Sequence, residues 1–305
     1  MTYAHEPVML DDCIEALEIS PNGIYLDCTA GLGGHSEGIA ARLDRGRLIC
    51  IDKDQMAVSR CEERLAPYRS HAAVVRCDFR RLSTVLDELD IPYIDGALFD
   101  LGVSSLQLDM PERGFSYRYD APLDMRMDAE APLSAFDIVN TWEFERIKGI
   151  LYDYGEERYA PLIAAAVVRN RPVPTTGRLV EIIKGAMPAK GRREGQHPAR
   201  RTFQAIRIAV NDELGALEEG LLAAVGRLCP RGRAVILTFH SLETRLVKNV
   251  FKRLENTCTC PPDFPRCVCG GGRVIKVLGR CFPSPEETGR NPRAECARLS
   301  IAEKV

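Results

Sequence analysis

The sequence predicts an α/β fold, a doubly wound parallel sheet that carries an inserted, mostly helical domain. Over residues 24–100, short apolar runs alternate with amphipathic stretches, which is typical of βαβ units. The apolar runs hold almost no charge, as expected for parallel strands that are covered on both faces. This alternation stops after about Gln107, and a strand pattern returns at residue 233.

The individual elements follow from these patterns in chain order. Strands are predicted at residues 24–28, 47–51, 73–77 and 97–100, with helices at 35–43, 55–65 and 81–89 between them. Residues 108–140 show no strand character, and helices are expected at about 143–153, 156–170 and 176–187. A basic loop at 188–201 precedes one long helix from Thr202 to Val225, whose apolar residues mostly recur at helical spacing.

The last part of the chain returns to the sheet. A strand is predicted at 233–239, a helix at 242–254, and two late strands at 273–278 and 297–301. We therefore predict a discontinuous α/β domain formed by residues 1–107 and 212–305. Residues 108–211 form the helical insertion.

Composition bounds the class of protein. The 305 residues carry a net charge of −2 and are 45% hydrophobic, which excludes an intrinsically disordered chain. No apolar run approaches the roughly 20 residues that span a bilayer, and the first residues lack the features of a secretion signal. We expect a cytoplasmic protein with no membrane partner. Its scattered cysteines are expected to be buried and reduced, namely Cys28, Cys50, Cys77 and Cys229.

A glycine-rich turn joins the first predicted strand to the first helix. It reads Asp27-Cys-Thr-Ala-Gly31-Leu-Gly33-Gly34-His35-Ser36. Glycines let the backbone approach a ligand closely, and the start of the following helix offers free N–H groups. The Gly-x-Gly-Gly spacing differs from the Gly-x-Gly-x-x-Gly of dinucleotide sites, and Asp27 suits a cationic amino group better than a pyrophosphate.

Two further strand ends extend this pattern. Asp52 lies 21 residues after Gly31, where a carboxylate can bind both hydroxyls of a ribose. Asp78 and Phe79 follow the third strand and suit an adenine amino group and a stacking surface. Together the three strand ends favour S-adenosylmethionine over a dinucleotide as the cofactor. The alternative is a tight turn beside acidic strand ends that bind no ligand.

The fourth strand ends at Asp100, and the carboxyl ends of parallel strands border the ligand crevice. A carboxylate there could hydrogen-bond the N–H of an exocyclic base amine and aim its lone pair at a methyl group. Alternatively, Asp100 only caps the turn that follows. His240, at the end of the strand at 233–239, is either a substrate contact or a structural histidine. The candidate catalytic residues are Asp100, Ser104 and His240.

Several motifs together resemble one family, the bacterial 16S ribosomal RNA cytosine-N4 methyltransferases (RsmH, also called MraW). The matching segments run nearly end to end, at residues 5–10, 27–36, 52–54, 100–109, 112–116, 122–128, 154–158, 197–211 and 239–243. The resemblance implies a Rossmann-like class I methyltransferase sheet. It also implies methyl transfer from S-adenosylmethionine to N4 of a cytosine in 16S rRNA, near the decoding centre of the small ribosomal subunit.

Motif positions in this family imply the cofactor contacts. They fall on Gly33, Gly34, His35, Asp52, Phe79, Asp100 and Gln107, to which the glycine-rich turn adds Asp27 and Gly31. Two positions depart from the family's pattern. Leu106 replaces the usual proline before Gln107, and residues 291–300 lack the usual second arginine and serine, which weakens the case for a basic contact there.

Charge is unevenly distributed along the chain. Between Arg169 and Arg207 there are ten basic residues and only two acidic ones. Lys and Arg side chains that bind phosphates supply most of the sequence-independent affinity for nucleic acid. We therefore predict an RNA contact around the basic loop, through Lys190, Arg192, Arg193, Arg200 and Arg201. The alternative is a solvated helix face.

Two segments keep alternatives open. Residues 109–130 combine six acidic residues, three arginines and three aromatic rings, so they wall a pocket for a flipped base or form a salt-bridged connector. Four cysteines stand in two C-x-C pairs, which is off the usual spacing of zinc sites: Cys258, Cys260, Cys267 and Cys269. They form a structural zinc site, reduced thiols or reversible disulfides, and no catalytic metal is predicted.

The sequence thus predicts an S-adenosylmethionine-dependent RNA methyltransferase that transfers the methyl group directly, without a covalent enzyme–base intermediate. Its expected partner is 16S rRNA, within the small ribosomal subunit, and both a monomer and a homodimer stay open. The alternatives are a methyltransferase of DNA or protein, a dinucleotide-dependent oxidoreductase, and a non-catalytic RNA-binding factor for ribosome assembly.

Overall fold

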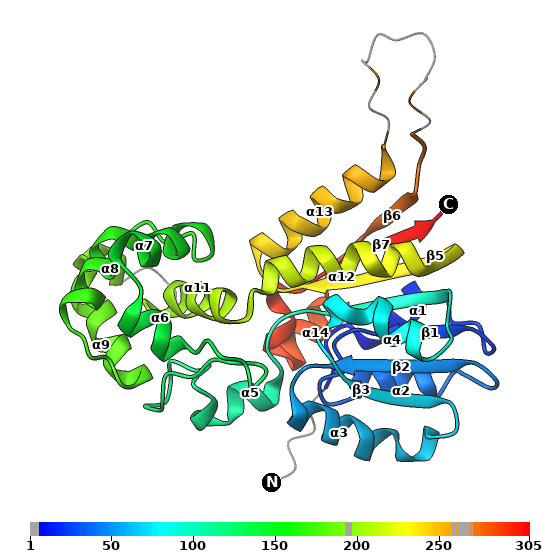
Figure 1. Ribbon diagram of the computed structural model, residues 1–305, viewed down its shortest axis with the longest axis horizontal. Helices are drawn as coiled ribbons and strands as arrows, with labels where there is room; N and C mark the ends of the chain where they lie inside the picture. Colours follow the sequence, from blue (N-terminus) through cyan, green and yellow to red (C-terminus); the bar gives the residue numbers. More distant parts are fainter. Residues whose placement is uncertain (1–5, 193–196, 258–259, 261–268, 270) are drawn as a thin grey trace. The chain divides into compact units, whose positions relative to one another are not determined.

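The computed structural model describes residues 6–192, 197–257, 260, 269 and 271–305, and the chain divides into two compact units (Figure 1). The α/β unit consists of Met1–Gly102 and Leu214–Val305, and the helical unit of Val103–Glu213. Both boundaries lie a few residues from the expected ones, which were drawn at Gln107 and Asn211.

The α/β unit is built on a seven-stranded sheet in the order β3-β2-β1-β4-β5-β7-β6. The strands are β1 (Ile24–Asp27), β2 (Arg47–Asp52), β3 (Ala72–Arg76), β4 (Ile94–Asp100), β5 (Leu228–Thr238), β6 (Ile275–Cys281) and β7 (Arg298–Lys304). The first five pair in parallel, whereas β7 runs antiparallel to both β5 and β6. The predicted α/β fold is therefore confirmed.

Helices cover both faces of this sheet. They are α1 (Leu10–Leu17), α2 (Gly34–Ala40), α3 (Gln55–Leu65), α4 (Leu82–Glu88), α12 (Glu213–Arg227), α13 (Ser241–Glu255) and α14 (Pro285–Arg290). Neighbouring strand residues point to opposite faces, so Leu98 packs in one apolar cluster with α1–α3 and Phe99 in a second cluster with α4, α12 and α13. Burial on both faces explains why the strands read as continuous apolar runs.

The helical unit has its own core, which includes the buried side chains of Leu151, Ile163, Ile183 and Ile206. Its helices are α5 (Ser105–Asp109), α6 (Ala135–Thr141), α7 (Phe144–Asp153), α8 (Ala160–Arg169), α9 (Thr176–Ala186), α10 (Ala189–Arg192) and α11 (Arg200–Asn211). The segment before α6 is held by Asn211, whose side chain accepts from Met127 N–H at 2.8 Å and donates to the Met125 carbonyl at 2.8 Å. None of the described helices is both long and apolar enough to cross a membrane.

The structure corrects the long helix predicted from Thr202 to Val225. It consists of α11 and α12, separated by Asp212, whose backbone adopts a left-handed conformation at φ 44°. The apolar spacing continues across this break, so the pattern alone did not reveal it. Helices α1 and α6 also went unpredicted; α6 begins at a capping box, in which Ser134 and Asp137 bond to each other's backbone N–H groups.

Candidate functional site

Three carboxylates end neighbouring strands at one edge of the sheet. Asp27, Asp52 and Asp100 are the last residues of β1, β2 and β4. Because these strands are parallel, with Asp27 in register with Cys50 on one side and Leu98 on the other, the three strand ends meet at the same edge. Ligands of open α/β sheets bind outside this carboxyl edge.

The glycine-rich turn between β1 and α2 needs its glycines for backbone reasons. Gly31 and Gly33 lie in the left-handed region, at φ 52° and 76°, where a side chain is strained. Gly31 N–H donates to Asp52 Oδ2 at 2.9 Å, which ties the turn to the end of β2. A Cβ on Gly34 would lie 2.3 Å from Cγ of Pro7, so the chain entering α1 also packs against the turn.

Asp27 does not face a ligand, which corrects the predicted contact with an amino group. Its exposed fraction is 0%, and both carboxylate oxygens accept bonds from the turn itself. Ser36 Oγ donates to Oδ2 at 2.6 Å and Thr29 N–H donates to Oδ1 at 3.1 Å. Burial raises the pKa of this carboxyl, while the bond from Ser36 opposes the rise. Asp27 therefore acts inside the turn, fixing its shape.

The His35 ring is also buried, and it holds Asp100 instead of pointing at a cofactor. Its Nε2 lies 3.0 Å from the Val8 carbonyl and its Nδ1 lies 3.4 Å from Asp100 Oδ2. Both partners are oxygens that only accept, so both ring nitrogens carry a proton. Burial lowers the pKa of His35, but the bonds to Asp100 and Cys13 outweigh it and hold the pKa well above its usual value.

Asp100 combines this partner with an accessible oxygen. Its backbone N–H donates to Thr29 Oγ1 at 2.6 Å, so the turn and the end of β4 are joined directly. The side chain is 26% exposed, and within the described part of the chain no group donates to its Oδ1. The sequence reasoning missed Thr29 and Val8 as supports of this residue, although both lie in the motifs at 27–36 and 5–10.

Asp52 is the carboxylate best placed for a ribose. Its two oxygens each accept one backbone N–H, from Gly31 and from Asp54, both at 2.9 Å. A carboxylate oxygen has two acceptor positions, so one on each oxygen is left for a hydroxyl. Burial raises the pKa of Asp52 to about 6, and the two N–H bonds only partly offset this rise.

The segment after β3 holds the predicted adenine contacts. Asp78 caps a short 3₁₀ turn by accepting from Arg80 N–H, and its Oδ2 lies 3.5 Å from Nζ of Lys53. The Phe79 ring meets Phe99 edge-on at a centroid distance of 5.6 Å, and a Cβ on Gly220 would lie 2.5 Å from the ring. Phe79 is half-buried, so part of its surface stays available for stacking.

Three other predicted residues serve as helix caps. In the helical unit, Ser104 Oγ accepts from Gln107 N–H at 3.3 Å while Gln107 Oε1 accepts from Ser104 N–H at 3.1 Å, the capping box of α5. In the α/β unit, His240 forms the same box on α13 with Glu243, which is 3% exposed. These bonds give Ser104 and His240 structural roles, which argues against the catalytic ones that were predicted for them.

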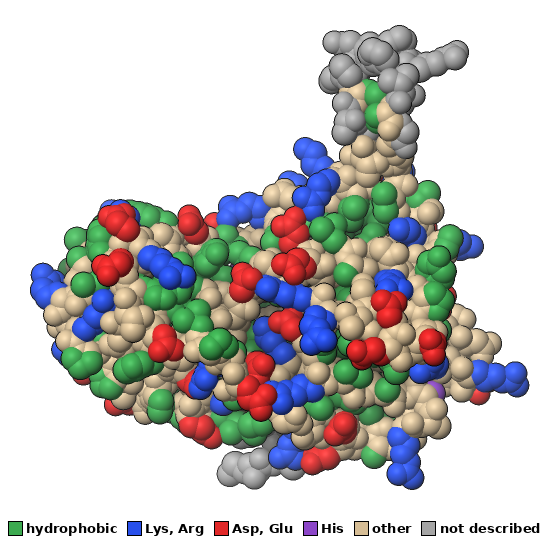
Figure 2. All heavy atoms as spheres, viewed as in Figure 1, with side chains coloured by type: hydrophobic (Ala, Val, Ile, Leu, Met, Phe, Trp, Pro, Cys, Tyr) green, Lys and Arg blue, Asp and Glu red, His purple; other side chains and the backbone are tan. Residues whose placement is uncertain are grey.

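The basic residues between Arg169 and Arg207 divide into two kinds. Some stabilise the helical unit from within, as Arg171 does by donating to the Val139 carbonyl and Arg207 by pairing with both oxygens of Glu213 at 2.8 Å. Arg201, a predicted RNA contact, donates to the Glu156 carbonyl at 3.0 Å. On the face shown in Figure 2, Lys and Arg side chains are interspersed with Asp and Glu. The positive residues therefore form no single patch on that face.

The other predicted RNA contacts and the cysteine cluster lie partly outside the described residues. Lys190 and Arg200 lie on α10 and α11. Arg193 falls outside the described residues, as do Cys258 and Cys267, and nothing is described of the Arg192 side chain. The cysteine alternatives therefore stay as the sequence left them.

The edge fits S-adenosylmethionine on the structure's own evidence. The turn offers backbone where no Cβ is tolerated, and Asp52 keeps acceptor positions for two hydroxyls. A parallel sheet with one antiparallel strand, β7, between β5 and β6 is the architecture of class I S-adenosylmethionine-dependent methyltransferases. Fold and site thus define the class.

The comparisons identify the family within this class. Residues 2–305 match the MraW methylase family, and the chain belongs to it. It is 50% identical over 311 residues to the ribosomal RNA small subunit methyltransferase H of Brevibacillus brevis, covering 100% of this chain and 99% of the relative. It is 51% identical to the protein of the same name from Symbiobacterium thermophilum, covering 100% and 98%.

A solved structure is also similar. The rRNA methylase from Streptococcus thermophilus superposes with a TM-score of 0.43 at 12% identity, covering 97% of this chain and 93% of the other. The predicted family and cofactor are confirmed by the family match, and the protein is an S-adenosylmethionine-dependent methyltransferase.

Proposed function

We propose that this methyltransferase modifies N4 of a cytosine in 16S rRNA, near the decoding centre of the small ribosomal subunit. The full-length relatives, at about half identity, are named for the small-subunit rRNA, which supports the RNA class. An amine is proposed as the methyl acceptor because Oδ1 of Asp100, at the end of β4, is accessible. A carboxylate there suits an N–H donor.

The main task of the protein in this reaction is to position the amine relative to the methyl group. S-adenosylmethionine supplies a methyl group that a nucleophile can accept. The lone pair of an exocyclic amine is delocalised into the base, so the amine must be turned to present it. Asp100 Oδ1 accepts one N–H of the amine and fixes its orientation. The same carboxylate can accept the proton that the nitrogen must lose.

His35 is the positioning residue for Asp100 in this proposal. The buried imidazolium bonds Oδ2 and so leaves Oδ1 for the substrate. Cys13 and Asp27 are the other titratable groups that face the ring.

The deciding experiment uses small subunits from a strain that lacks the enzyme, incubated with the protein and S-adenosylmethionine. Mass spectrometry of the RNA maps the modified base. We expect one N4-methylated cytosine with the wild-type protein, and at least a hundredfold slower transfer with Asp100→Ala at saturating S-adenosylmethionine. Full methylation by Asp100→Ala would refute the role of this residue, and a modified base other than cytosine would refute the proposed target.

A second variant separates positioning from general stability. His35→Gln keeps a donor toward Asp100 but not the positive charge, so we expect slower transfer. Because the pKa of the wild-type ring lies well above its usual value, transfer by the wild type should fall at high pH, where His35 loses its proton, and the variant should lack this fall. A merely structural histidine would lower thermal stability without changing the pH profile of transfer.

A further inference from the structure

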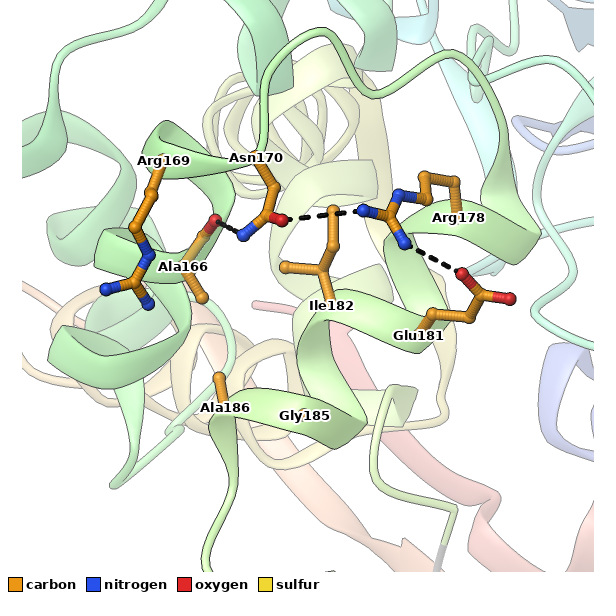
Figure 3. A pocket seen from close by; sticks show the side chains of 8 residues that line it. All are labelled: Ala166, Arg169, Asn170, Arg178, Glu181, Ile182, Gly185 and Ala186. Atoms are coloured by element: carbon orange, nitrogen blue, oxygen red, sulfur yellow. Dashed lines mark hydrogen bonds and ion pairs between the residues drawn. The ribbon is translucent and has the colours of Figure 1, made fainter.

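A hollow on the helical unit lies between α8 and α9, outside every residue assigned so far. Figure 3 shows Arg169 and Arg178 at opposite rims, with Ile182 between them. The volume is about 230 Å³, and the remaining lining side chains are small or polar. The hollow is open to solvent along the groove between the two helices.

Helical spacing explains why the hollow exists. Arg178, Ile182 and Gly185 stand at spacings of four and three on α9, so they line one stripe of that helix. Ala166 and Asn170 do the same on α8 and its C-cap. A Cβ added at Gly185 would meet nothing within 4 Å, so the missing side chain keeps the groove open.

The charges of the rim are only partly satisfied. Arg178 pairs with Glu181 at 2.9 Å and lies 3.4 Å from the Asn170 side-chain oxygen. Arg169 is exposed and has no hydrogen-bond or ion-pair partner among the residues that the structure describes. Two guanidinium groups against one carboxylate leave the rim positive.

We propose that this hollow binds one unpaired nucleotide of the RNA substrate. Arg169 and Arg178 hold its phosphate, and the base enters the space left by Gly185, against the guanidinium plane of one of these arginines. Single-stranded RNA is recognised by positive side chains along the backbone and by planar groups, aromatic rings or arginine guanidinium groups, on which an unstacked base stacks. The inference rests on RNA being the substrate and adds a contact separate from the basic loop.

The first test fills the hollow. Gly185→Leu places a side chain in the groove, whereas Gly149→Leu makes the same change on α7, where a Cβ also meets nothing within 4 Å. We expect Gly185→Leu to weaken binding of unmethylated small subunits about tenfold, the size of one base contact. Gly149→Leu should leave binding unchanged. Both variants should keep the wild-type cofactor affinity and melt at or above the wild-type temperature, because leucine is a better helix former than glycine.

The second test changes the charge in both directions. Arg178→Gln should weaken binding about tenfold and lower the salt dependence by the equivalent of about one phosphate. Glu181→Gln frees Arg178 and should strengthen binding severalfold, a gain that loss of structure does not produce. Arg60→Gln is the matched control, because Arg60 is an exposed arginine paired with Glu63 at 2.8 Å on α3.

The outcomes separate this inference from the proposed function. If Gly185→Leu and Arg178→Gln bind subunits as the wild type does while subunits are methylated normally, the hollow is no RNA site and the proposed function stands. If the wild-type protein does not bind subunits, both fall. If inorganic phosphate competes at millimolar concentration while the Gly185→Leu change has no effect, the rim binds free anions only and the nucleotide assignment is wrong.

Discussion

The two units of this protein place their polar groups in opposite ways. In the α/β unit, the polar side chains at the carboxyl edge are joined in a buried network, in which Asp27, His35 and Asp100 each bond to backbone or to one another. In the helical unit, the charged side chains proposed to bind RNA are exposed, as Arg169 and Lys190 are. The first arrangement suits one small ligand of fixed shape, and the second a large polyanion.

This difference has an energetic basis. Buried polar groups are costly unless each is satisfied, so the network around Asp100 holds one geometry. Exposed arginines contribute little to the stability of the fold, and their main contribution is electrostatic affinity for a negatively charged partner. We therefore expect cofactor binding and RNA binding to respond to different substitutions and to different solution conditions.

The largest effect should come from the basic loop. Neutralising Arg192, Arg193, Arg200 and Arg201 together removes up to four phosphate contacts, so we expect binding of small subunits to fall by about a hundredfold or more at physiological salt. The affinity for S-adenosylmethionine should not change. Filter binding over a range of salt concentrations measures both the loss and the reduced slope.

The same four positions changed to lysine are the control, because they keep the charge. Arg201 also bonds the Glu156 carbonyl, so melting temperatures must accompany the comparison. Unchanged subunit binding by the neutral variant would mean that the loop is a solvated surface.

The next effect tests the α/β unit alone. Gly33→Ala forces a side chain into a left-handed backbone and within 3.2 Å of Cys61 Sγ. We expect the turn to shift and the affinity for S-adenosylmethionine to fall by about a hundredfold, with RNA binding retained. Gly226→Ala on α12, where a Cβ meets nothing within 4 Å, should bind the cofactor like the wild type. Calorimetric titration that shows equal affinities for all three proteins would contradict the assigned role of the turn.

These two units also differ in how far the sequence predicts them. The strands of the sheet and the acidic residues at their ends were predicted almost in place, because a covered parallel strand leaves an uninterrupted apolar run. The direction in which a side chain points was harder to predict. Asp27 was placed at the correct strand end but was assigned to the ligand, because nothing in a linear pattern shows that Ser36 donates a hydrogen bond to its carboxylate.

The helical unit exposes the second limit. The single helix predicted over 202–225 is interrupted at Asp212, where one left-handed residue separates α11 from α12 without disturbing the apolar spacing. Likewise, the count of basic residues did not separate Arg171 and Arg207, which serve the fold, from Arg169, which does not. A sequence gives the number of basic side chains, but only the tertiary structure shows which of them already bond to other groups of the protein.

Stability of the helical unit should depend on one half-buried amide, that of Asn211. Asn211 makes three bonds, to Met125 and Arg207 carbonyls and from Met127 N–H, at 2.8 to 2.9 Å. Replacing it with alanine removes the partner of Met127 N–H and of the Met125 carbonyl, and we expect a loss of about 2 kcal/mol in the free energy of unfolding. The exposed Asn249 on α13, changed to alanine, should cost far less. A loss of cofactor affinity with Asn211→Ala would show that the units are not independent.

The smallest effect is a dependence of cofactor binding on pH. Burial raises the pKa of Asp52 to about 6 from 3.8, so the unliganded carboxyl gains a proton as the pH falls through 6. Ribose hydroxyls donate to the ionised form, so affinity should be constant above about pH 7 and fall as much as tenfold by pH 5. The stability of the unliganded fold also depends on this group. As the pH rises toward and through 6, Asp52 loses its proton in a buried site and the free energy of unfolding falls; bound hydroxyls offset that loss. Asp52→Asn removes the titrating group, so its affinity should be weak and independent of pH between 5 and 7. If the variant instead keeps the wild-type pH profile, the titrating group is another residue, and the ribose must be held elsewhere along the edge.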